Sequence, residues 1–386
     1  MSDTEVEIVT LTRHDEVLAA LRSRELRQAL YDAGEVVMAD VLVNLHGDDH
    51  RARRRLENRL FRRDTHERYE RELFPAVIDE TMADHLASGG CELVALSHQL
   101  MMNLAALTAG VDRPTGTVEE SLHLHDYLMR FVEGATLAHH TGDVEAKRAE
   151  VAEALARFDR EFLAPSVERR TALLRAGEEL PADVLSTLLG HQDELHLPPD
   201  VVLRETCFFL LAGAHTSATA FIRTLHHLFG WLAVHPDDVE RLRSDRLFVQ
   251  RCVHETVRLQ PSSPVAMRWA LSAVTLPSGR VIPAGAKVVL DLVAVNQDPG
   301  RWGDHPERFD PTRPVPDGEQ PWGLSFGSGM HACIGQDLAA GLAPKGGDDP
   351  AAHLFGLVPI AVQWMLDHGA RPDPDNPPVL DPHSAR

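Results

Sequence analysis

One ten-residue segment near the C-terminus constrains this chain more than any other, and we call it the cysteine loop: Phe326-Gly327-Ser328-Gly329-Met330-His331-Ala332-Cys333-Ile334-Gly335. It places a single cysteine among three glycines, just ahead of a helix-like stretch at 336–340. Glycine has no Cβ and tolerates positive φ, so backbone amides can approach the sulfur closely. Amide donors and a helix N-terminus stabilise a thiolate, which is a soft ligand for iron. The alternative is a buried free cysteine in a glycine-rich turn.

The cysteine loop resembles the heme-binding loop of the cytochrome P450 family, whose pattern is Phe-Gly-x-Gly-x-His/Arg-x-Cys-x-Gly. All six fixed positions match. The resemblance implies a heme b cofactor with Cys333 as the axial ligand of the iron. It also places four further residues of the loop at the heme: Phe326, Gly327, His331 and Gly335. Thiolate ligation pushes electron density toward the iron and favours O–O cleavage.

Length and composition are those of a large globular protein. The 386 residues exceed the usual size of a single core, yet no Pro/Gly/Ser-rich linker or charge run divides them. We therefore expect one domain over 1–386, mainly α with a small β-rich part. The resemblance implies the α-rich, triangular cytochrome P450 fold, short at both ends relative to the family. A net charge of −20 argues against nucleic-acid binding.

Targeting signals and a disulfide framework are missing from the sequence. The N-terminus is acidic and polar, and the longest nearly apolar stretch, 354–366, is too short to span a bilayer. The four cysteines (Cys91, Cys207, Cys252 and Cys333) show no disulfide pattern, which indicates a reducing compartment. These observations predict a soluble, cytoplasmic protein without a membrane partner.

Hydrophobic periodicity and breaker residues predict the main elements. We expect a long helix from Pro198-Pro199-Asp200 to about His235-Pro236, and a helix after Cys333 that breaks at Gly341 and resumes near Ala351. The other expected elements are a strand at 6–11, a helix at 15–21, one helix over 48–63, further helices on to about 175, a helix at 247–260, and strands at 274–276, 281–282 and 287–292.

A carboxylate and a guanidinium share one helical face at Glu255 and Arg258, which are three residues apart. Such a pair alone is a weak signal, because many solvated helices carry one. Here it lies on an apolar helix that ends at proline, and it resembles the Glu-x-x-Arg pair that stabilises the P450 core behind the heme. The resemblance implies a third partner from the coil that follows, for which we predict Arg308, with Arg313 as the alternative.

The middle of the long helix reads Ala212-Gly213-Ala214-His215-Thr216. A helix–helix crossing is the ordinary reason for such a glycine. The Thr216 hydroxyl can also bond the Ala212 carbonyl and open a groove. The segment resembles the P450 oxygen-activation motif, which implies that Ala212 and Gly213 lie against the heme and that Thr216 passes protons to the reacting oxygen. His215 occupies the usual acidic position, as in the sterol demethylase branch, and imidazole can relay protons near neutral pH.

Heme propionates need cations or hydrogen-bond donors. His50 and Arg54, four residues apart, resemble the His-x-x-x-Arg propionate clamp of the family, and Arg268 and His331 resemble its other propionate partners. The remaining arginines between 51 and 63 predict a solvated basic face that suits an acidic redox partner.

The resemblance as a whole implies a heme-thiolate monooxygenase. It would activate O2 with NAD(P)H electrons, delivered by a ferredoxin and ferredoxin reductase, to hydroxylate or epoxidise a small organic substrate in secondary or catabolic metabolism. Alternatives are peroxygenase or oxidative-coupling chemistry and a non-catalytic heme-thiolate sensor. A di-iron enzyme lacks a second Glu-x-x-His beside Glu120 and His123. Candidate pocket walls are 31–42, 124–136, Phe208, Phe209, Leu211, Val265 and Ala266.

Overall fold

The computed structural model describes residues 6–344 and 351–379 and divides into two compact units. The first unit comprises residues 1–26 and 219–386, and the second comprises residues 27–218. One boundary falls inside the long helix α12 (Pro199–Val234), so this helix contributes residues to both units. The expectation of one domain over 1–386 stays a prediction.

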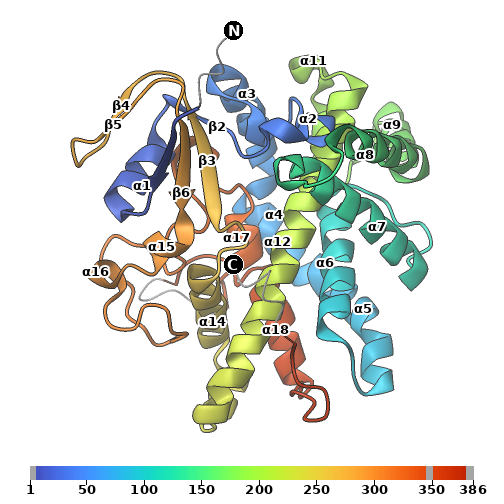
Figure 1. Cartoon of the computed structure of the whole chain (residues 1–386). Coiled ribbons are helices and arrows are strands. Elements are labelled where there is room, and N and C mark those ends of the chain that lie inside the picture. The colour runs from blue at the N-terminus through green and yellow to red at the C-terminus, as the bar shows by residue number, and fades with distance from the viewer. Residues whose placement is uncertain (1–5, 345–350, 380–386) are drawn as a thin grey trace. The chain divides into compact units, whose positions relative to one another are not determined.

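Helices build the second unit (Figure 1). In it α5 packs on α6, α6 on α7, and α7 on α8. Besides the first half of α12, its helices are α2 (Glu35–Met38), α3 (Gly47–Glu57), α4 (Arg63–Arg68), α5 (Phe74–Ser88), α6 (Leu93–Ala109), α7 (Val118–Ala135), α8 (Val144–Phe158), α9 (Ala164–Ala176), α10 (Val184–Gly190) and α11 (Gln192–Leu195). Short turns link these helices. The 3₁₀ turns are η1 (Asp32–Gly34), η2 (Leu42–Asn44), η3 (Asn58–Phe61) and η5 (Leu137–His139), and the π turns are η4 (Tyr69–Leu73) and η6 (Asp159–Leu163).

The arginine-rich segment forms two helices instead of one. α3 ends at Glu57, η3 follows, and α4 begins only at Arg63. Seven arginines between 51 and 63 leave few apolar side chains to continue one buried stripe along this segment. The chain bends here, and the single helix expected over 48–63 is therefore wrong.

Side-chain caps fix the start of the helices that matter most for the site. Glu92 accepts the N–H groups of Val94 at 3.1 Å and Ala95 at 2.6 Å, and this begins α6. At the start of α7, Thr117 accepts the Glu120 N–H at 3.2 Å while the Glu120 carboxylate accepts the Gly116 N–H at 2.8 Å. These two helices are therefore positioned by local sequence as well as by packing.

A four-stranded sheet forms the β part of the first unit, with strand order β1 (Ile8–Leu11), β6 (Lys287–Asp291), β3 (Val265–Ala270) and β2 (Leu26–Gln28). β1 pairs parallel with β6, and β3 pairs antiparallel with it. The helix α1 (His14–Arg22) packs its apolar residues on the core formed with Val288 and Leu290. A two-stranded hairpin, β4 (Val274–Thr275) and β5 (Val281–Ile282), lies beside this layer (Figure 1). The sequence predicted these strands except β2 and β3.

The remaining helices of the first unit include two that the sequence predicted well. α14 (Arg246–Leu259) begins where Asp245 accepts the Phe248 N–H and ends shortly before Pro261. α17 (Gln336–Ala340) ends at Gly341, whose φ is 73°, as expected. Helix structure resumes at Leu357, later than predicted. The others are α13 (Asp238–Ser244), α15 (Leu292–Asn296), α16 (Pro299–Trp302), the 3₁₀ turn η7 (Gly329–His331) and α18 (Leu357–Asp367).

Two further predictions concern the chain as a whole. No disulfide joins the four cysteines, all of which lie within the described residues, in agreement with the missing disulfide pattern. Among the helices of residues 6–344 and 351–379, none is long and apolar enough to cross a membrane.

Candidate functional site

The cysteine loop exposes its thiol. The Cys333 N–H donates to the Phe326 carbonyl at 2.8 Å and closes the loop, while the Cys333 side chain is exposed. Gly327 and Gly329 have φ values of 68° and 73°, which favour glycine. A Cβ at Gly329 would lie 2.8 Å from the Leu21 carbonyl oxygen. The glycine therefore lets the loop rest directly on α1.

The donors around this thiol fit a heme thiolate. α17 begins three residues after Cys333 with Gly335 as its N-cap, and first-turn N–H groups of a helix have no intrahelical acceptor. An accessible sulfur next to such amides is held more readily as a thiolate than a sulfur buried among apolar groups. The buried-cysteine alternative does not apply to Cys333, although it describes Cys207 and Cys252. Burial raises the pKa of both those thiols.

Glu255 and Arg258 form the ion pair that the sequence predicted. Arg258 donates through Nε and Nη2 to the two Glu255 oxygens, at 2.8 and 2.7 Å, and both side chains are fully buried. Arg258 also donates to the carbonyls of Asn296 and Pro306, and its guanidinium lies 4.8 Å from the Trp302 ring centroid. A buried ion pair offsets its desolvation cost only with such additional partners.

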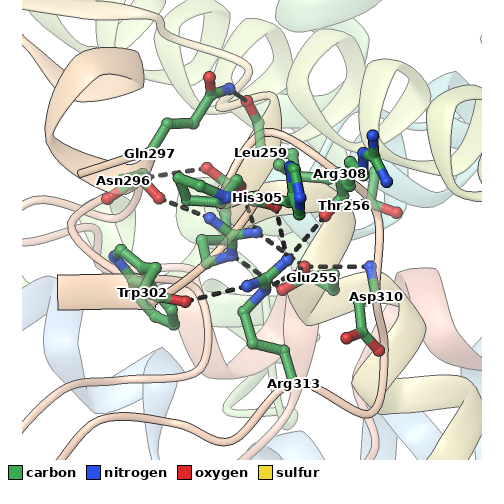
Figure 2. Close-up of polar contacts among 12 residues, drawn as sticks. Glu255, Thr256, Leu259, Asn296, Gln297, Trp302, His305, Arg308, Asp310 and Arg313 are labelled. Carbon is green, nitrogen blue, oxygen red and sulfur yellow. Dashed lines mark hydrogen bonds and ion pairs between the residues drawn. The ribbon is translucent and has the colours of Figure 1, made fainter. Parts of the chain in front are cut away.

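The third partner is Arg313, and the prediction of Arg308 is wrong. Arg313 is buried, and its Nε donates to Glu255 Oε1 at 3.3 Å. Figure 2 shows its guanidinium between Glu255 and the Trp302 carbonyl, which it reaches at 2.9 Å. Arg308 is exposed and pairs with its neighbour Glu307, while its carbonyl accepts from Arg313. The coil turns back on itself at 305–310, so the later arginine reaches the interior.

Arg268 is a buried cation on the central part of the sheet. It lies on β3 opposite Val288 of β6, and its side chain is only 4% exposed. Burial lowers the pKa of Arg268 to about 10, because removal from water disfavours the charged form. A carboxylate against this guanidinium would offset that cost. Arg268 therefore has the character expected of a propionate partner, a role that stays a prediction, as does that of His331.

The oxygen-activation segment lies in the second unit. Thr216 Oγ1 donates to the Ala212 carbonyl at 2.6 Å, as predicted. A Cβ at Gly213 would meet the Ala105 side chain of α6 at 3.4 Å, so Gly213 faces a helix crossing. This supports the packing alternative for the glycine, whereas contact of Ala212 and Gly213 with heme stays a prediction. His215 lies near His98, with ring centroids 6.4 Å apart.

The predicted propionate clamp on α3 differs from a pair of cations. Burial, together with the charges of Arg54 and His46, lowers the pKa of His50 to about 4, so His50 is neutral at pH 7. Arg54 is half-buried, and its Nε donates to Asn58 Oδ1 at 3.0 Å. Arg54 would therefore supply the charge toward a propionate, and His50 only a hydrogen bond.

Sequence reasoning missed a cluster of buried charges beside this helix. Glu205 of α12 accepts from Arg53 Nη1 at 2.7 Å and from the Leu42 N–H at 3.0 Å through each oxygen. Glu57 is fully buried, and neither of its oxygens has a hydrogen-bond partner within the described residues. Burial raises the pKa of Glu205 to about 7. Arg53 and Glu57 share α3, but no spacing rule links them to Glu205, which comes from α12.

The remaining predictions concern the surface and the histidines. Arg51, Arg55, Arg59, Arg62 and Arg63 are exposed, as the basic-face prediction required, whereas Arg53 is buried and departs from it. Within residues 6–344 and 351–379, no group of three or more His, Cys, Asp or Glu side chains is arranged to hold a metal ion, which argues against the di-iron alternative. Among the described histidines, five are buried: His14, His50, His66, His254 and His353.

Comparisons with known proteins agree with these observations. The chain is 27% identical to the "C-19 steroid 1alpha-hydroxylase" of Sorangium cellulosum over 98% of this chain and 91% of that protein. It is 31% identical to human "Cytochrome P450 4F12" over 41% of this chain, and it spans about a third (34%) of that relative's length. The solved structure of "Sorangium cellulosum So Ce56 cytochrome P450 260B1" shares the fold, with a TM-score of 0.72, 22% identity, and coverage of 95% of this chain and 83% of that one.

The match to a whole family decides the assignment. The sequence model described as "Cytochrome P450" matches residues 144–341, just over half of the chain, and that range contains Thr216, the Glu255–Arg258 pair and Cys333. The family consists of heme-thiolate oxidoreductases that bind heme b, so the predictions of fold class, enzyme class and cofactor are confirmed at this level. The chain belongs to the cytochrome P450 family.

Proposed function

We propose that this protein is a monooxygenase that hydroxylates or epoxidises a small apolar organic molecule, with electrons from NAD(P)H through a ferredoxin and its reductase. The observation that carries the proposal is the exposed thiol of Cys333, presented by a glycine-bent loop directly ahead of a helix. When bound to such a thiolate, heme supplies O2 activation. Cys333 would be the iron ligand, with Phe326, Gly327, His331 and Gly335 around it.

The protein's own residues would supply charge and protons. Arg268 and Arg54 offer guanidinium groups to the two propionates, and His50 offers a neutral N–H donor. In α12, Thr216 donates its hydroxyl to the Ala212 carbonyl, and such a bond can bend a helix and open a groove beside it. Thr216 and His215 are the groups we assign to proton delivery.

An acidic electron donor suits the exposed arginines that follow Arg53. These residues (Arg55, Arg59, Arg62 and Arg63) lie within nine positions on α3, η3 and α4. Opposite charges accelerate association and orient the encounter. No flavin or iron–sulfur signature occurs in the sequence, which supports a separate ferredoxin.

The substrate class rests on composition and on the named relative. The candidate walls at 124–136 and at Phe208, Phe209 and Leu211 are largely apolar, and the Sorangium relative is named for a C-19 steroid. We therefore propose a rigid, apolar molecule of about that size, and androstenedione is a suitable first probe. A polar substrate would leave its donors and acceptors unpaired against such walls.

The test is spectroscopic and then chemical. The reduced, CO-bound protein should show the red-shifted Soret band of thiolate ligation, Cys333→Ser should lose it, and Cys91→Ser, which alters another exposed thiol, should keep it. Androstenedione should shift the iron spin state, and a product carrying one ¹⁸O atom should form from ¹⁸O2, NADPH, ferredoxin and its reductase. Thiolate ligation without oxygen insertion into any of a panel of apolar compounds would favour the sensor. Turnover with hydrogen peroxide alone would favour the peroxygenase.

A further inference from the structure

Three histidines from three helices meet in the second unit. His98 of α6 and His125 of α7 have ring centroids 4.8 Å apart, and the rings of His98 and His215 of α12 are nearly parallel at 6.4 Å. All three side chains are half-buried. His215 directly precedes Thr216 in α12, so this histidine cluster (His98, His125 and His215) lies one residue from the one to which we assign proton delivery. Consecutive side chains of a helix do not face each other, so a water would pass the proton from the His215 ring to the Thr216 hydroxyl.

Packing between the helices fixes the cluster. Ser97, next to His98, donates its hydroxyl to the Ala218 carbonyl at 3.0 Å, and Ala218 lies three residues after His215. On the other side, Ser121 donates to Asn103 Oδ1 of α6 at 2.7 Å, one turn before His125. Both bonds are buried, so they hold α12 and α7 against α6 at the level of the histidines. Buried hydrogen bonds between the three helices therefore hold the three rings close to one another.

The cluster is neither a metal site nor an anion site. The described residues include no set of three ligating side chains with metal-binding geometry, so these rings do not form one. Burial lowers the pKa of both His98 and His125, and the neighbouring charges of His98 and His215 lower that of His125 further. His98 and His125 are therefore neutral at pH 7 and carry no charge with which to hold an anion. They do carry one donor and one acceptor nitrogen each, as a proton relay requires.

Carboxylates at the protein surface complete the arrangement. Glu92, the exposed N-cap of α6, raises the pKa of His98, and exposed Asp126 raises that of His125. Glu92 and Asp126 are thus the carboxylates whose charges act on the His98 and His125 rings. His125 Nε2 is buried and has no hydrogen-bond partner among residues 6–344 and 351–379. A ring nitrogen in this position can exchange a proton directly or through one water.

We propose that His98, His125 and His215 form a proton relay that carries protons from solvent to the Thr216 hydroxyl during O2 reduction. The inference rests on the proposed function of Thr216. Each imidazole accepts a proton at one nitrogen and releases one from the other, so no charge accumulates. The protons balance the reaction: two electrons and two protons convert O2 to hydrogen peroxide, and four of each convert it to two waters. The ring tautomers are reset by the next proton from solvent.

The test uses O2 as the acceptor, so it needs no organic substrate. Heme-loaded protein receives electrons from NADPH through ferredoxin and its reductase, and the share of consumed O2 that appears as hydrogen peroxide is measured. Because forming two waters takes four protons and forming hydrogen peroxide takes two, a slower proton supply would leave a larger share of the consumed O2 as hydrogen peroxide. We expect His98→Gln and His125→Gln to lower water formation relative to peroxide by about tenfold, less than a full general-acid effect because water can partly replace a ring.

The matched control is His123→Gln, which alters an exposed histidine on α7 that pairs with Glu161. It should match wild type. A solvent isotope effect on the product ratio separates proton delivery from packing: it should be larger in the two relay variants, because their remaining water path limits the rate. Equal heme occupancy after size-exclusion chromatography confirms that the variants are folded.

A second readout does not depend on turnover. NMR titration of histidine side chains should show a higher His125 pKa in His98→Gln than in wild type, because the charge of His98 lowers it. Unchanged peroxide yields in both relay variants would overturn the relay, even if oxygen insertion into a substrate is observed. An unchanged His125 midpoint would overturn the cluster itself. By contrast, a normal relay effect without any hydroxylated product would count against the proposed function alone.

Discussion

Replacing Glu57 by glutamine should remove a pH-dependent loss of stability. Glu57 and Glu205 are both fully buried, and Arg53 is the cation that contacts Glu205. Burial, and then the charge of Glu205, raise the pKa of Glu57 well above 4.5. Glu57 therefore holds its proton to a higher pH in the folded protein than in the unfolded chain. Glutamine has nearly the same shape as the protonated acid but does not titrate.

The sign and the magnitude follow from linkage. Between pH 4.5 and the raised pKa, the folded state binds more protons than the unfolded state, so the free energy of unfolding falls as the pH rises. Each group contributes up to about 1.4 kcal/mol per pH unit over that interval. For Glu205, whose pKa moves from 4.5 to about 7, this amounts to about 3 kcal/mol in total. The same sign applies to Glu57, so Glu57→Gln should gain stability relative to wild type as the pH rises above 4.5.

The assay is urea unfolding of heme-loaded protein from pH 5 to pH 8, followed by far-ultraviolet circular dichroism and by the Soret band. Glu57→Gln should match wild type near pH 5 and become the more stable protein as the pH rises. Glu153→Gln, which changes an exposed carboxylate on α8, is the matched control and should follow wild type throughout. Parallel profiles for Glu57→Gln and wild type would refute the reasoning, since Glu57 would then be ionised or in contact with water.

Three further predictions follow from the same contacts. Arg313→Ala should lower the free energy of unfolding by about 3–5 kcal/mol, because Glu255 and several buried carbonyls lose their cation. Arg308→Ala should lower it by less than about 0.5 kcal/mol in the same urea unfolding assay. Arg268→Ala should lower the heme-to-protein ratio after size-exclusion chromatography, while Arg280→Ala, an exposed change in the same unit, should not. Arg62→Ala and Arg63→Ala should each lower the ferredoxin-supported rate about twofold at low salt and change it little at high salt. Arg243→Ala, which alters an exposed arginine elsewhere, should leave the rate unchanged at both salt concentrations.

Sequence reasoning succeeded where a few neighbouring positions carry the information. The limits of α12 and α14 follow from prolines that a helix interior cannot accept, and the Glu255–Arg258 pair follows from a spacing of three residues. The bond between Thr216 and the Ala212 carbonyl is equally local, four residues apart along one helix. In each case the geometry of a single element determines the contact.

Sequence reasoning failed where a contact depends on the path that the chain takes between helices and strands. Arg308 and Arg313 are five residues apart in a coil without a regular period, so no pattern indicates which one turns inward. Glu57 and Glu205 belong to helices separated by almost 150 residues, and each taken alone is an ordinary helical glutamate. β3 was missed because Arg268 and Trp269 interrupt a short apolar run with large polar and aromatic side chains.

The buried carboxylates and the histidine cluster share one helix, and this has a consequence for how each is measured. Glu205 and Thr216 are eleven residues apart in α12, which places them about three turns apart on nearly the same face. If ionisation of Glu57 and Glu205 loosens this helix above pH 7, the proton relay would weaken in the same pH range for an unrelated reason. The background of Glu57→Gln separates the two, because it reduces the first effect and leaves every histidine in place. A relay defect of His98→Gln that persists in this background at pH 8 belongs to proton delivery, and one that disappears belongs to the stability of α12.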